Sequence, residues 1–250
     1  ASTLLSDVQK TNVRTTLLPV VQAELQAFTI EQAIKQALAL PDYLAKLNAL
    51  AAVIPQAANL TFGGSTQNLF ASALVQVFNE RVTQMLDALK QLAALLTSAL
   101  TSPLLAAPQQ KYVQDMLNTL AVEIAIKSAL AFADYGDQLD ALLDMIFQYK
   151  EIRVVDQRVQ GLFFDVLKQV FANRVGQYTT PGLDDTNIDK LALLLLNASE
   201  STLLNTAQQT VTESWGIIVT FEQMTLNALK LTYPAQLSNA LRILRSAPGK

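Results

Sequence analysis

The chain has 250 residues, a formal net charge of −3, and neither cysteine nor histidine. Its charges are scattered without a basic cluster, which argues against nucleic-acid binding, and the missing His and Cys remove the commonest general base, metal ligands and disulfides. Apolar residues make up 51% and charged residues 16%, so the chain has more apolar surface to bury, and less charge to face water, than an average domain.

Apolar residues recur at spacings of three and four along the chain, which predicts amphipathic helices and an all-α fold. The first helix carries four apolar residues, Leu4, Val8, Leu17 and Val21. We expect Pro19 to kink or break it. A second helix is expected over 29–40 and a third over 42–54. The loop PQAANLTFGGS follows, and one long helix is expected over 65–100, stopped by Pro103.

The second half of the chain repeats this pattern. Helices are expected over roughly 104–133, 136–150, 157–178, 199–231 and 234–245. The TTPGLDD loop precedes a short helix through KLALLLL. Two β-branched stretches, YKEIRVVD and WGIIVTF, read locally as strands. We expect the second to be helical because it aligns with a helical stretch of the preceding unit, whereas the first could be extended.

Two pairs of segments show that the chain repeats itself. IEQAIKQALALPDYLAKLNAL at 30–50 resembles VEIAIKSALAFADYGDQLDAL at 122–142, an offset of 92 positions. QNLFASALVQVFNERV at 67–82 resembles QGLFFDVLKQVFANRV at 160–175, an offset of 93. The one-residue insertion falls between them, where a surface loop absorbs it at little cost. Conserved register over such a length predicts a tandem duplication.

A third, partial copy closes the chain. SPLLAAPQQ at 102–110 resembles STLLNTAQQ at 201–209, an offset of 99. We therefore predict a helical bundle with internal pseudo-symmetry, built from two units of about 100 residues and a half unit. The expected bounds are 1–100, 101–198 and 199–250, which together form one continuous fold.

No catalytic residue, metal site or cofactor is predicted. The chain lacks a phosphate-binding loop, a GxGxxG segment and a nucleophile elbow. The acidic cluster of Asp184, Asp185 and Asp189 lacks the glycine and the final glutamate of a calcium loop, so a helix N-cap explains it better. We expect the protein not to be an enzyme.

Six aromatic residues that recur in the repeat are candidates for lining a cavity: Tyr43, Phe70, Phe78, Tyr135, Phe163 and Phe171. The phenylalanines of each unit lie eight positions apart, a little over two helical turns, so they share one face. The tyrosine hydroxyls would supply polar handles for a ligand. The alternative is an ordinary dense core, which requires the same residues at the same spacing.

The segment ALPDYLAKLNAL at Ala39–Leu50 is similar to the Leu-Pro-aromatic turn of the insect midgut allergen repeat family. The second unit departs from that turn, because Ala133 stands where the proline would be. The resemblance implies tandem helical units that enclose lipid. Helical repeat units of silk proteins are a looser analogy, since this chain lacks their serine and glycine content.

These observations leave two functions open. The first is a secreted carrier that holds an apolar small molecule, a lipid or a pigment, in an interior cavity. The second is a structural, self-associating homo-oligomer that buries its surplus apolar surface between subunits. No stretch predicts a membrane span. The start at Ala1 without a methionine, and the glycosylation motifs at Asn59 and Asn197, are compatible with secretion.

Overall fold

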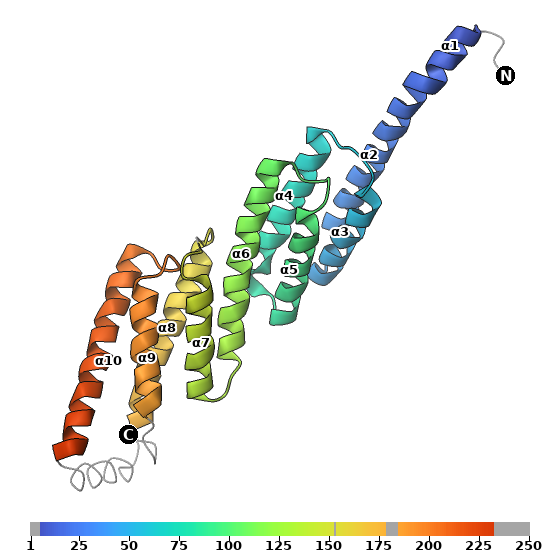
Figure 1. The fold of residues 1–250 in the computed structure, drawn as a ribbon. Coiled ribbons are helices and arrows are strands. Elements are labelled where there is room, and N and C mark those ends of the chain that lie inside the picture. Colours follow the sequence, from blue (N-terminus) through green and yellow to red (C-terminus); the bar gives the residue numbers. More distant parts are fainter. Residues whose placement is uncertain (1–5, 153, 179–184, 233–250) are drawn as a thin grey trace. The chain divides into compact units, whose positions relative to one another are not determined.

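A computed structural model of the chain describes residues 6–152, 154–178 and 185–232. The fold is all-α, as predicted (Figure 1). The chain divides into two compact units, Ala1–Leu117 and Asn118–Lys250, and the division falls inside helix α6 (Ala107–Leu130). The bounds 1–100, 101–198 and 199–250 stay a prediction. No described helix combines the length and the apolar content that crossing a membrane requires.

The first unit is helical, and four of its helices, α2 to α5, pack together (Figure 1). In chain order they are α1 (Asp7–Asn12), the π-helix η1 (Val13–Leu17), α2 (Leu18–Leu38), α3 (Tyr43–Ala57), α4 (Gly64–Glu80), the 3-10 helix η2 (Arg81–Thr83), α5 (Leu86–Leu100) and the first part of α6. Helix α2 packs against α3 and α4, and α5 packs against both of these. Large apolar side chains from these helices form the buried core.

Pro19 does not break the first helix. Proline has no N–H, so it cannot bond the carbonyl four residues earlier, and its ring crowds that carbonyl. The residues before Pro19 form a π-helical turn over Val13–Leu17, in which the Leu18 N–H donates to the Val13 carbonyl. The helix then continues as α2, so the expected first and second helices are one continuous element.

The long helix expected over 65–100 is wrong, because the chain forms α4 and α5 with a turn between them. Gln84 and Met85 have extended backbones, with ψ angles of 149° and 161°. At the end of α4 the Arg81 guanidinium donates to the Phe78 carbonyl at 2.7 Å. Both helices bury one apolar face, so the periodicity of the sequence runs across the turn without showing it.

The second unit continues from α6 through α7 (Tyr135–Tyr149), α8 (Gln157–Tyr178), α9 (Asp185–Ser199) and α10 (Thr206–Thr232). Helix α9 packs against α7, α8 and α10, and α8 packs against α10 (Figure 1). WGIIVTF lies within α10, as predicted. YKEIRVVD spans the end of α7 and the connection to α8, and its residue 153 lies outside the described residues. The helix expected over 234–245 also lies outside them.

Aspartates begin two helices at matching places. The Asp42 carboxylate accepts a hydrogen bond from the Ala45 N–H at 2.7 Å, and Asp134 accepts one from the Asp137 N–H at 3.0 Å. Each satisfies a backbone donor that the first helical turn leaves unpaired. These caps fix where α3 and α7 begin, and therefore where the tyrosine that follows each aspartate points.

Replacing Thr212 by valine should stabilise the protein. Within the described residues the buried Thr212 hydroxyl has no hydrogen-bond partner, and an unpaired buried hydroxyl costs about 1–3 kcal/mol. Valine has nearly the same shape, so Thr212→Val should raise the free energy of unfolding by about 1 kcal/mol in a urea titration. Thr210→Val is the control, because that exposed hydroxyl already donates to the Thr206 carbonyl. An equal effect of both substitutions would contradict this explanation.

Candidate functional site

All six aromatic residues expected to line a cavity are buried or partly buried. Phe70 and Phe163 are completely buried and Phe78 and Tyr43 nearly so, while Tyr135 and Phe171 pack against the core of the second unit. Burial of this kind fits a packed core as well as it fits a cavity wall. The polar groups around these rings are therefore more informative than their burial.

Both tyrosine hydroxyls are bonded to backbone carbonyls. Tyr43 in α3 donates to the Val77 carbonyl in α4 at 3.0 Å, and Tyr135 in α7 donates to the Val170 carbonyl in α8 at 2.8 Å. Burial raises the pKa of the Tyr135 hydroxyl well above its ordinary value, although the charge of the Arg174 guanidinium lowers it. Each hydroxyl thus ties one helix to the next.

Loss of the Tyr135 hydroxyl should change how stability depends on pH. At neutral pH, Tyr135→Phe should cost about 1 kcal/mol, the value of one hydrogen bond. The pKa of the Tyr135 hydroxyl is higher in the folded than in the unfolded chain. Its contribution to the free energy of unfolding is therefore complete below the unfolded pKa of about 10, and is lost as the pH rises towards the folded pKa. Urea titrations above about pH 10 should therefore show a steeper loss of stability in the wild type than in the variant.

Tyr112→Phe is the matched control for this substitution, since Tyr112 is 49% exposed. It should leave the free energy of unfolding at neutral pH unchanged. A Tyr135→Phe variant that follows the wild-type alkaline profile would contradict the assignment of this pH dependence to Tyr135.

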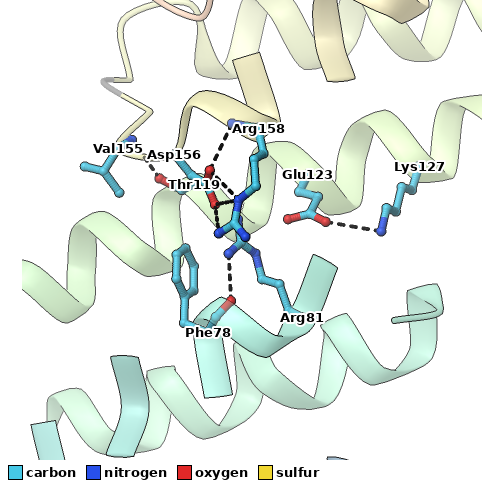
Figure 2. Close-up of polar contacts among 8 residues, drawn as sticks. All are labelled: Phe78, Arg81, Thr119, Glu123, Lys127, Val155, Asp156 and Arg158. Carbon is cyan, nitrogen blue, oxygen red and sulfur yellow. Dashed lines mark hydrogen bonds and ion pairs between the residues drawn. The ribbon is translucent and has the colours of Figure 1, made fainter. Parts of the chain in front are cut away.

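Arg81, directly after α4, and Arg174, within α8, make the same two contacts. The Arg81 guanidinium donates to the Phe78 carbonyl at 2.7 Å and lies 3.7 Å from the centroid of the Phe78 ring (Figure 2). Arg174 donates to the Phe171 carbonyl at 2.7 Å and lies 3.8 Å from the Phe171 ring centroid. A guanidinium over an aromatic face is a favourable cation–π contact. One face of Phe78 and one of Phe171 are therefore covered by an arginine.

Arg174 also connects α8 to α10. Its Nε and Nη2 each donate to a carboxylate oxygen of Glu222 at 2.9 Å, a bidentate ion pair. The Trp215 ring stacks on Phe171, with centroids 5.1 Å apart, and on Phe164, with centroids 5.3 Å apart. Phe171 thus contacts both the Arg174 guanidinium and the Trp215 ring of its own unit. These contacts stabilise the packing of α8 against α10.

Figure 2 also shows a contact that joins α6 to the segment before α8, and a pair within that segment and the start of α8. The Thr119 hydroxyl accepts a hydrogen bond from the Val155 N–H at 3.1 Å. Arg158 forms a bidentate pair with Asp156, and this hydrogen bonding raises the pKa of Arg158. These contacts fix backbone positions within the second unit.

Several carboxylates of the second unit pair with a cation or an amide. Lys127 pairs with the nearly buried Glu123 at 3.1 Å, and the Gln223 amide donates to Asp189. In the described ranges no three acidic side chains lie close enough together to hold a metal ion. Asp184 of the acidic cluster lies outside those ranges, and Asp185 is the first residue of α9.

An apolar groove runs between α9 and α10, and we call it the α9–α10 groove. Its volume is about 520 Å³, and it is lined by Ala192, Leu193, Leu196, Glu213, Gly216, Ile217, Thr220, Phe221 and Met224. Phe221 is 71%, Met224 66% and Ile217 65% exposed. Large apolar side chains at such exposure are costly to leave in water, so the groove is a candidate binding surface.

A second apolar surface lies on the first helix, and we call it the N-terminal strip. It consists of Val13, Leu17, Val21, Leu25 and Phe28, which are 38–64% exposed. Their spacing of four, four, four and three places them on one face of the helix. From Ser6 to Thr29 no residue is buried, and burial begins at Ile30. The helix from Val13 to Phe28 therefore has an apolar face that is exposed to solvent.

The described residues define an all-α protein with local polar contacts that stabilise helices and with two uncovered apolar surfaces. Comparison with known proteins adds no relative, since no family model, no curated protein and no solved structure matches the chain.

Proposed function

We propose that the chain is a non-enzymatic, structural helical repeat protein that associates with copies of itself. The observation that carries this proposal is the pair of exposed apolar surfaces, the N-terminal strip and the α9–α10 groove. Contiguous apolar surface of this kind marks interaction sites on soluble proteins. The low share of charged residues, 16%, leaves little to keep such surfaces apart in solution.

Two pairs of helices, with one member in each unit, agree in length, which supports the proposal that the chain is a repeat protein. Helices α3 and α7 both have 15 residues and begin at Tyr43 and Tyr135, and α5 and α9 both have 15 residues and begin at Leu86 and Asp185. The tyrosine-to-carbonyl bond and the arginine-on-phenylalanine contact also occur once in each unit. We infer that 30–82 and 122–175 descend from one duplicated segment and are related by internal pseudo-symmetry.

Light scattering over a range of concentrations tests self-association. The wild-type mass should rise with concentration, and Phe221→Asp should keep the chain monomeric because it places a charge in the groove. Phe147→Asp in α7 is the matched control, since Phe147 is 53% exposed but lies outside both surfaces. It should associate like the wild type. A wild-type chain that stays monomeric at the highest concentration contradicts the proposal.

Carriage of an apolar ligand is the second candidate, and the size of the groove favours it. Its volume of about 520 Å³ lies within the range of about 300–1,000 Å³ typical of ligand sites. An interior cavity lined by the six aromatic residues, and secretion of the carrier, remain part of this candidate. Native mass spectrometry of protein from its natural source decides: a lipid or pigment at fixed stoichiometry supports carriage, and protein without one contradicts it.

A further inference from the structure

We propose that copies associate head to tail, with the N-terminal strip of one copy docked in the α9–α10 groove of a second copy. This inference rests on the proposed self-association and adds which surfaces meet. Three observations support it: three apolar side chains that are peculiar to the groove, the side of the helix on which the strip lies, and the opposite charges of Arg14 and Glu213.

Three large apolar side chains of the groove have small or polar equivalents earlier in the chain. Leu193, Leu196 and Ile217 line the groove. The residues 99 positions earlier are Ala94, Thr97 and Asn118, which are small or polar. The two helix pairs otherwise bury the same pattern of residues, so these three large side chains are not needed to pack α9 on α10. Apolar residues added to an exposed face indicate a binding surface.

The strip lies on a side of the helix that is buried elsewhere in the chain. Of the five residues 92 positions after the strip, Leu105, Val113 and Leu120 are apolar and buried, whereas Gln109 and Leu117 are partly exposed. Val113 and Leu120 lie in α6, so the equivalent side of that helix is largely buried, whereas on α2 it faces solvent. The strip is thus a packing face without its cover, and a second copy can supply that cover.

The groove is long enough to hold about three quarters of the strip, and Arg14 and Glu213 supply one pair of opposite charges. The strip covers 15 helical steps from Val13 to Phe28, about 22 Å, and the α10 wall of the groove from Glu213 to Met224 covers about 16 Å. An apolar helix face in an apolar groove is a common recognition mode. Glu213 is the charged residue of the groove lining, and Arg14 flanks the strip. Pairing Arg14 with Glu213 directs the docked helix parallel to α10.

Each copy carries one strip and one groove, so the contact is heterologous. Such contacts build open chains or closed rings, in contrast to a two-fold dimer, which stops at two copies. The mass of the wild type should therefore pass beyond that of a dimer as the concentration rises.

Mixing two half-blocked variants tests this geometry. The strip variant carries Val21→Asp and Leu25→Asp, and the groove variant carries Ile217→Asp and Phe221→Asp. All four residues are 62–71% exposed, so both variants should keep the wild-type helix content by circular dichroism. Each alone should be monomeric in sedimentation. Mixed, they should form a one-to-one complex that does not grow, because only one intact strip and one intact groove remain.

Exchanging the paired charges tests the orientation of the docked helix. Arg14→Glu and Glu213→Arg should each weaken association about tenfold, and a chain carrying both should regain it. Lys90→Glu, on the exposed side of α5, is the control and should have no effect. Failure of the doubly exchanged chain to recover would overturn the pairing of Arg14 with Glu213.

The outcomes separate this inference from the proposed function. A wild-type chain that associates, with half-blocked variants that do not combine, would overturn head-to-tail docking and leave self-association standing. Association of the strip variant or the groove variant alone at wild-type strength would do the same. A monomeric wild type would remove both proposals.

Discussion

Phe163→Ala should lower the free energy of unfolding by about 3–5 kcal/mol, because it empties the centre of a packed core. Phe163 in α8 is completely buried within the hydrophobic cluster of the second unit. The cost combines the lost transfer free energy of the ring with the cavity that remains. Phe221→Ala is the matched control, since Phe221 is 71% exposed, and it should change monomer stability by less than about 0.5 kcal/mol.

Trp215 is the only tryptophan of the chain and lies in α10 against Phe171, so its fluorescence reports unfolding of the second unit. Urea titrations at low protein concentration keep self-association from adding to the measured stability. Equal effects of Phe163→Ala and Phe221→Ala would contradict the division of phenylalanines into core and exposed surface.

Arg174→Ala should cost about 2–3 kcal/mol, the second-largest effect expected. The substitution removes the bidentate pair with Glu222, the hydrogen bond to the Phe171 carbonyl and the contact with the Phe171 ring. Breaking a fully buried ion pair costs about 3–5 kcal/mol. Since the side chains of Arg174 and Glu222 are 14% and 30% exposed, solvent screening reduces that figure.

A double-mutant cycle measures the interaction itself. Arg174→Ala, Glu222→Ala and the double variant should give a coupling free energy of about 1–2 kcal/mol in the same urea titrations. Lys10→Ala is the control, because Lys10 pairs with an almost fully exposed Asp7 and such pairs contribute less than about 1 kcal/mol. A loss below about 0.5 kcal/mol for Arg174→Ala would contradict a structural role for this contact.

The helices could be predicted from the sequence because local chemistry sets their ends. Asp42 and Asp134 cap α3 and α7, and the expected starts at 42 and 136 lie within one residue of the observed ones. Apolar spacing of three and four gave the all-α class directly. WGIIVTF shows that its place in a helical pattern outweighs β propensity, since this stretch lies inside α10.

Two local features of the backbone could not be predicted from residue spacing. The turn at 81–85 has neither glycine nor proline, although Gln84 and Met85 have extended backbones there. Pro19 leaves the helix continuous because a π-helical turn absorbs it. Neither outcome follows from residue spacing.

Exposure is the second property that spacing cannot give. The strip residues Leu17 and Val21 were expected to belong to an ordinary amphipathic helix, and the pattern is the same whether that face is covered or bare. Leu193, Leu196 and Ile217 lie in stretches rich in apolar residues, so nothing in their neighbours marks them as exposed. Comparison with Ala94, Thr97 and Asn118 was the available signal, since these small or polar residues stand at the equivalent positions.

Amide hydrogen exchange at low and high protein concentration tests the central claim most directly, because it reports where copies touch one another. Exchange should slow with concentration in the strip, 13–28, and in the two walls of the groove, 192–196 and 213–224, and stay unchanged in α3 and α7. Protection that appears elsewhere, or in none of these segments while the mass of the wild type rises, would contradict the claim that the strip and the groove carry self-association.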